Sequence, residues 1–147
     1  MLVIEIANEH EVSFNATRLK KAVRAILKDA AIAAGEISIA VVSDAQMHLL
    51  NRKYLEHDYP TDVLSFVLEE REGYLEGEII VSSEYAAQEA ERFGWSMDDE
   101  LLLYVIHGAL HLIGEDDLTP EAKQQMRQRE QHYLAKFDLI PRYAAEE

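Results

Sequence analysis

The chain has 147 residues, a formal net charge of −14 and no cysteine. This length favours a single domain over residues 1–147, and the lack of cysteine excludes disulfide bonds and thiolate metal ligands. The negative charge argues against broad binding to DNA, and no apolar stretch approaches the length of a membrane span, so we expect a cytoplasmic protein that does not contact a membrane.

The hydrophobic pattern predicts a first part in which strands and helices alternate. Its expected elements are a strand over residues 2–7, a helix over 16–34, a strand over 37–42, a helix from Asp44 to about Tyr54, and strands over 63–68 and 74–81. Gly35 is expected to end the first helix, and Asp44 is expected to cap the second. The last two strands are expected to pair as an antiparallel hairpin.

Three further helices are expected after the hairpin. Side chains that commonly cap helices mark their starts, namely Ser82 or Ser83, Ser96, and Thr119 with Pro120 after it. Gly94 is expected to end the first of the three. The resulting order, βαβαββααα, predicts an α+β domain in which a four-stranded mixed sheet packs against helices.

The segment His107-Gly-Ala-Leu-His111-Leu-Ile-Gly114-Glu-Asp-Asp117 has the spacing of a metal site. On a helix, His107 and His111 lie on one face about 5–6 Å apart, so one ion can bind a nitrogen of each. Gly114 readily takes a left-handed turn, which can bring Asp117 back as a third ligand. We expect one divalent metal ion here, with zinc preferred and Mn²⁺ as a second choice. The alternative is a pair of core histidines that only form hydrogen bonds to backbone carbonyls.

The same spacing resembles the zinc-protease signature, which favours a small metallopeptidase as one possible function. Gly108, however, occupies the position at which those proteases have the glutamate that activates water. Peptide hydrolysis by that route therefore lacks its base. A glycine inside a helix is costly, so we expect Gly108 to allow the close approach of another backbone or of a substrate.

Three runs of sequence together resemble the YbeY family of bacterial rRNA maturation factors. They are Leu50 to Phe66, which contains Pro60-Thr-Asp-Val-Leu-Ser-Phe66, then Gly77-Glu-Ile-Ile-Val-Ser82, and finally His107 to Gly114. The resemblance covers most of the chain. It implies a metal-dependent endoribonuclease that cleaves single-stranded RNA, works with the ribosome, and matures ribosomal RNA, notably the 3′ end of the small-subunit 16S species.

Two positions depart from the family pattern. Asp117 stands where the family usually has histidine, and Leu55 stands where it usually has an arginine that could bind a phosphate. Arg52, Lys53 or His57 could replace that arginine, with ordinary surface charge as the alternative. These departures also leave open a ribosome-associated assembly factor in which the metal is mainly structural.

Further candidate site residues lie outside the histidine motif. Lys20, Arg24 and Lys28 recur at every fourth position, and with Arg52 they form the expected RNA-binding set, although a solvated helix face has the same pattern. Asp62 is the candidate catalytic residue, because it could position water or orient a metal-binding histidine. Its alternative role is to cap the turn after Pro60.

Overall fold

The computed structural model describes residues 1–55 and 63–141, which form one α+β unit. Its elements, in chain order, are β1 (Leu2–Asn8), α1 (Ala16–Asp29), β2 (Ala34–Val42), α2 (Asp44–Leu55), β3 (Val63–Arg71), β4 (Tyr74–Ser82), α3 (Ser83–Phe93), α4 (Met97–Leu112) and α5 (Pro120–Ala135). This order confirms the predicted βαβαββααα. Within the described residues, no helix combines the length and the apolar character needed to cross a bilayer.

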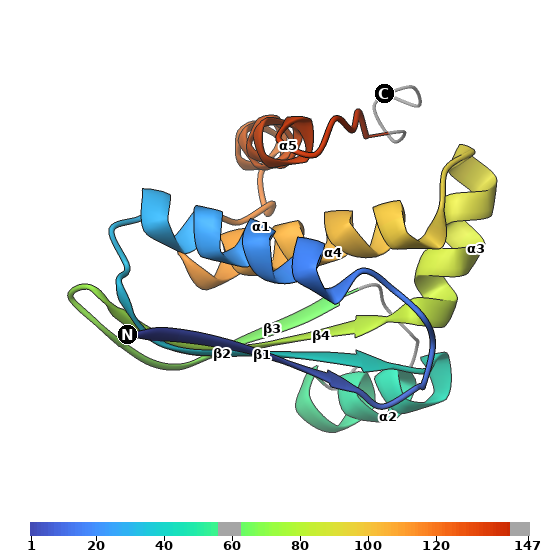
Figure 1. Cartoon of the computed structure of the whole chain (residues 1–147), viewed down its shortest axis with the longest axis horizontal. Helices are drawn as coiled ribbons and strands as arrows, with labels where there is room; N and C mark the ends of the chain where they lie inside the picture. Colours follow the sequence, from blue (N-terminus) through green and yellow to red (C-terminus); the bar gives the residue numbers. More distant parts are fainter. Residues whose placement is uncertain (56–62, 142–147) are drawn as a thin grey trace.

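The sheet is mixed and four-stranded, as predicted. Its strand order is β1-β2-β4-β3, with β1, β2 and β4 parallel and β3 antiparallel to β4. Helices α1 and α4 lie on one face of the sheet, α2 lies on the other, and α5 lies beyond α4 on the side away from the sheet (Figure 1). Helix α4 is therefore the central element between the sheet and α5.

The main hydrophobic core lies between the sheet and the helices α1 and α4. Apolar residues surround α4 on nearly every side, so it is buried along most of its length. A second, smaller cluster forms under α2 on the opposite face of the sheet, from Val42, Met47, Leu64 and Ile80. The larger core fixes α4, which is the helix that carries both motif histidines.

The predicted starts of the last three helices are confirmed. Ser82, Ser96 and Thr119 each accept a hydrogen bond from the backbone N–H three residues later. Gly94 ends α3 with a φ of 78°, which is the left-handed conformation expected of a glycine at this position.

The predicted end of the first helix is wrong, and so is the predicted role of Gly35. Helix α1 ends at Asp29, five residues before the predicted end, because Ala31 adopts a φ of 61° and the N–H of Ile32 donates to the carbonyl of Leu27 at 2.9 Å. Gly35 instead belongs to β2, where a Cβ atom would lie 1.9 Å from the carbonyl oxygen of Leu75. This glycine is therefore required by the close approach of β4, and alanine provides the turn.

The predicted cap of α2 is also wrong, although the helix itself is confirmed. Ser43 is the capping residue, because its hydroxyl accepts from the N–H of Gln46 at 3.2 Å. The carboxylate of Asp44 instead accepts a hydrogen bond from the Ser82 hydroxyl at 2.5 Å. Asp44 therefore connects the start of α2 to the end of β4.

Candidate metal centre

The end of α4 reverses the chain through the predicted glycine turn. Gly114 has a φ of 102°, its N–H donates to the carbonyl of His111 at 3.0 Å, and the N–H of Glu115 donates to the carbonyl of Leu110 at 3.0 Å. This pair of hydrogen bonds is the Schellman arrangement that ends many helices. It returns the chain along α4, so that Asp117 lies beside the two histidines.

Three side chains converge at this turn. The Nε2 atoms of His107 and His111 lie 2.9 Å apart, and the carboxylate oxygens of Asp117 lie 3.6 Å from the first and 3.9 Å from the second. In a tetrahedral zinc site with bonds of about 2.0–2.1 Å, neighbouring ligand atoms lie roughly 3.3 Å apart. Two imidazole nitrogens and a carboxylate oxygen at these separations fit a divalent ion with small adjustments.

Glu130 of α5 contacts His107 at Nδ1, the ring nitrogen that does not face the other two side chains. Its carboxylate lies 2.6 Å from His107 Nδ1 and the residue is 4% exposed. When His107 Nδ1–H donates to this carboxylate, the lone pair on Nε2 is directed at Asp117 and His111. Metal-binding histidines commonly have such a carboxylate partner, which fixes the tautomer and the ring orientation.

Sequence reasoning did not identify Glu130, although the sequence contained a signal. The residue interrupts the buried side of α5, which otherwise presents Met126, Tyr133 and Leu134 to the interior. A carboxylate in such a position needs a buried partner. The distance of 23 residues from His107 hid which partner it has.

The surroundings of His111 favour its neutral, metal-binding form. Burial lowers the pKa of His111, and the neighbouring His107 lowers it further, while Asp117 acts in the opposite direction. A neutral imidazole offers its lone pair to a metal, whereas a protonated one cannot.

Gly108 brings α4 onto the sheet. A Cβ atom at this position would lie 2.8 Å from Ile79 Cγ2 and 3.0 Å from Ser65 Oγ, and the Ser65 hydroxyl donates to the Gly108 carbonyl at 3.1 Å. The expected close approach is therefore made by side chains of the sheet, and the expectation that a backbone or a substrate makes it is wrong. The contact sets the depth at which α4 lies.

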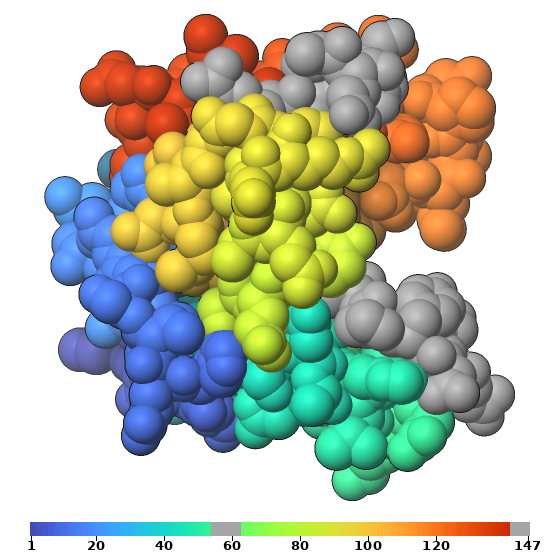
Figure 2. Space-filling view, turned by 90° about the vertical axis from the view of Figure 1, so that its right-hand side faces the viewer, coloured from blue at the N-terminus to red at the C-terminus, as the bar shows by residue number. Residues whose placement is uncertain are grey.

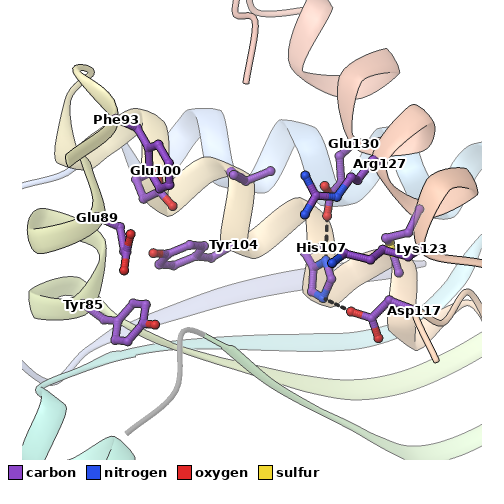
Figure 3. Close-up of a pocket in the computed structure, with 12 residues that line it drawn as sticks. Tyr85, Glu89, Phe93, Glu100, Tyr104, His107, Asp117, Lys123, Arg127 and Glu130 are labelled. Carbon is purple, nitrogen blue, oxygen red and sulfur yellow. Dashed lines mark hydrogen bonds and ion pairs between the residues drawn. The ribbon is translucent and has the colours of Figure 1, made fainter. Parts of the chain in front are cut away.

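Two hollows meet at His107 and Asp117, and the second of them also reaches His111. A hollow of about 370 Å³ lies between α3, α4 and α5, and one of about 470 Å³ runs along β3. Both are lined by His107 and Asp117. Figure 3 shows the side chains around the first hollow, and Figure 2 shows the notch between α3 and the start of α5. His107 and Asp117 are therefore open to both hollows.

The structure places the other candidate residues away from these hollows. Lys20, Arg24 and Lys28 lie on α1, where Arg24 donates to the carbonyl of Leu2 at 3.2 Å and, with Lys28, lines a separate hollow. Arg52 lies in the last turn of α2, on the other side of the sheet. Asp62 and His57 lie outside the described residues. Within the described part of the chain, the structure thus brings together His107, His111 and Asp117, and adds Glu130.

Comparisons with known proteins agree on one family. The family model described as Endoribonuclease YbeY matches residues 5–138. A protein of this name from Rhodopirellula baltica is 42% identical over 127 residues, covering 80% of this chain and 64% of that protein. Another from Chlorobaculum tepidum is 37% identical over 131 residues, covering 89% and 95%.

A solved structure shows the same architecture. The solution structure of a Thermotoga maritima protein has a TM-score of 0.61 and 27% sequence identity, and the match covers 97% of this chain and 95% of that one. The family match begins within β1, runs into the residues after α5, and includes both histidines, Asp117 and Glu130. The chain therefore belongs to the YbeY endoribonuclease family, whose members are hydrolases acting on phosphodiester bonds.

Proposed function

We propose that this chain is a zinc-dependent endoribonuclease that cleaves single-stranded RNA during the maturation of ribosomal RNA, at the 3′ end of the small-subunit 16S species. Family membership supports the reaction class, since the relatives carry the name endoribonuclease. The observation that carries the proposal is the convergence of His107, His111 and Asp117 where two hollows meet.

The residues around the site have distinct tasks in this proposal. A divalent ion held by the two histidines and Asp117 supplies Lewis acidity toward a phosphodiester. Glu130 keeps His107 in the tautomer whose Nε2 is a ligand. Asp117 adds a negative charge that balances part of the charge of the ion. Asp62 is our candidate for positioning the attacking water.

Gly108 favours RNA over peptide as the substrate. It offers no carboxylate at the position where zinc proteases have their base. A Cβ atom added there would lie 2.8–3.0 Å from side chains of the sheet, so there is no room for a larger residue. Hydrolysis of a phosphodiester does not require a base at that position.

The test is cleavage of a labelled single-stranded RNA that carries the 3′ end of small-subunit rRNA. We expect the zinc-loaded protein to cut it, and we expect His111→Ala to lose both the metal and the cleavage while the melting temperature of the metal-free protein changes little. His132→Ala is the matched control, because His132 is an exposed histidine on α5. Its metal content and activity should equal those of the wild type.

The proposal fails if wild-type protein with stoichiometric metal leaves the RNA intact across a range of metals and salt concentrations. If such inactive protein is also strongly stabilised by metal, so that His107→Ala sharply lowers its melting temperature, the assembly-factor alternative replaces the nuclease.

A further inference from the structure

We propose that the hollow between α3, α4 and α5 binds the nucleotide next to the cleaved phosphodiester, and that Lys123 and Arg127 hold the phosphate of this nucleotide. The proposal rests on the RNA-cleaving function proposed above. It assigns a substrate contact to α5, a helix for which the sequence pattern predicts no contact with RNA.

The two cations stand on the face of α5 that is turned to the metal site. Lys123, Arg127 and Glu130 share this face because they are spaced by four and three residues. Glu130 fixes the direction of the face through its contact with His107. Both cations line the hollow that contains His107 and Asp117, and Figure 3 shows Lys123 extending from α5 toward these two residues.

The charge of the hollow makes these cations necessary for an anionic substrate. The chain carries a net charge of −14, and Glu89, Glu100 and Glu130 line the same hollow. All three carboxylates have a partner: Glu89 pairs with Arg92 at 3.5 Å, Glu100 accepts from Trp95 Nε1 at 2.6 Å, and Glu130 contacts His107 at 2.6 Å. A phosphodiester still needs local positive charge to approach so acidic a surface.

Other basic residues do not supply that charge. Among the described residues, Lys123 and Arg127 are the lysine and arginine side chains that line the two hollows meeting at His107. Arg24 and Lys28 line the separate hollow beside α1. Leu55 stands at the position where the family resemblance predicts an arginine. The structure thus offers the phosphate a partner from α5.

The far end of the hollow suits the base of the same nucleotide. Tyr85 and Phe93 of α3 line it together with Tyr104 of α4, and the rings of Tyr85 and Tyr104 lie 6.2 Å apart at 58°. Aromatic side chains bind unpaired bases by stacking, with little dependence on sequence. The volume of about 370 Å³ is in the range of small-ligand sites. A hollow with cations at one end and aromatic rings at the other matches one unpaired nucleotide.

The first experiment removes the charge of the side chain and the charge of the RNA linkage, separately and together. A single-stranded RNA with one cleavage site is made with an uncharged methylphosphonate at each linkage flanking the cut, one at a time. For wild-type, zinc-loaded protein, we expect one of these substitutions to lower kcat/KM by about tenfold. Lys123→Met should lower kcat/KM on unmodified RNA, mainly through KM, and should lose much less than the wild type when that linkage is neutralised, because only Arg127 still contacts the phosphate.

The controls separate this contact from general charge effects. Lys136→Met removes the same charge from an exposed position at the end of α5, and we expect it to cleave like the wild type. Lys123→Arg should recover most of the activity. Lys123→Met should also flatten the dependence of log KM on log salt by about 0.7, the value for one lost phosphate contact on a single strand. Its metal content should stay stoichiometric.

The base end is tested in the same way with an abasic nucleotide. Wild-type protein should lose about tenfold in kcat/KM when the nucleotide beside the cut lacks its base, and Tyr85→Leu should be insensitive to that change. Two results would overturn the phosphate assignment. One is an unchanged kcat/KM in Lys123→Met, and the other is a methylphosphonate that lowers kcat/KM by the same factor in Lys123→Met as in the wild type. A wild type that cuts no RNA would instead overturn the proposed function, so the two failures are distinguishable.

Discussion

Helices α4 and α5 build opposite sides of the candidate site in different ways. α4 is buried almost throughout and carries His107 and His111 at 21% and 29% side-chain exposure. α5 buries only Met126, Glu130, Tyr133 and Leu134, and presents charged side chains to the hollow. Hydrophobic packing therefore positions the metal ligands, whereas charge on a more exposed helix orients one ligand and prepares the site for its substrate.

Removing Glu130 should produce the largest effect among variants that leave the ligands intact. An amide in place of this carboxylate has no negative charge and can also present its NH2 group to the ring, so it fixes the tautomer of His107 less firmly, and we expect Glu130→Gln to weaken metal binding by about 10–100-fold. Competition with a chromophoric chelator measures this affinity. Glu121→Gln, an exposed change in the first turn of α5, is the control and should bind metal like the wild type. Equal affinities for Glu130→Gln and wild type would mean that α5 does not orient the ligand.

Adding a side chain at Gly108 should disturb the packing of α4 against the sheet. The nearest atoms to an added Cβ are Ile79 Cγ2 at 2.8 Å, Ser65 Oγ at 3.0 Å and Val63 Cγ2 at 3.1 Å, so Gly108→Val forces α4 away from the sheet. We expect the free energy of unfolding to fall by about 1–3 kcal/mol. Chemical denaturation of the metal-free protein measures this, with Ala87→Val on the exposed side of α3 as the matched control. A stability equal to that of the control would show that this contact does not set the depth of α4.

Loosening the attachment of α5 should have the smallest effect. The Tyr133 hydroxyl donates to Asp29 at the end of α1, at 2.7 Å, and Tyr133→Phe should cost about 1 kcal/mol of unfolding free energy. We expect faster hydrogen exchange in α5 and little change in α4. Tyr74→Phe at the β3–β4 turn serves as control and should leave exchange in α5 unchanged. Equal acceleration in both helices would mean that α4 and α5 open as one unit.

Local chemistry made much of this molecule predictable from its sequence. Ser96 and Thr119 cap helices through contacts three residues away, and Gly114 permits the turn that returns Asp117 to the histidines. Each of these features depends on neighbouring residues, so a linear pattern contains the information. The candidate ligands His107 and His111 could be predicted for the same reason, because they lie four residues apart on one helix.

Contacts between distant segments explain what the sequence did not reveal. Gly35 is required by the carbonyl of Leu75, forty residues away, and was therefore mistaken for a helix end. Glu130 and Lys123 belong to the site only because α5 packs over α4. The spacing of Lys20, Arg24 and Lys28 indicated a basic face, but spacing alone does not place that face relative to the histidines.

The most direct test of the central claim is a crystal structure of zinc-loaded protein with anomalous scattering data recorded at the zinc edge, together with the zinc content of the same preparation. We expect one zinc per chain and a single anomalous peak bound by His107 Nε2, His111 Nε2 and a carboxylate oxygen of Asp117. A preparation that stays free of metal in excess zinc, or a map in which these three side chains point apart, would contradict it.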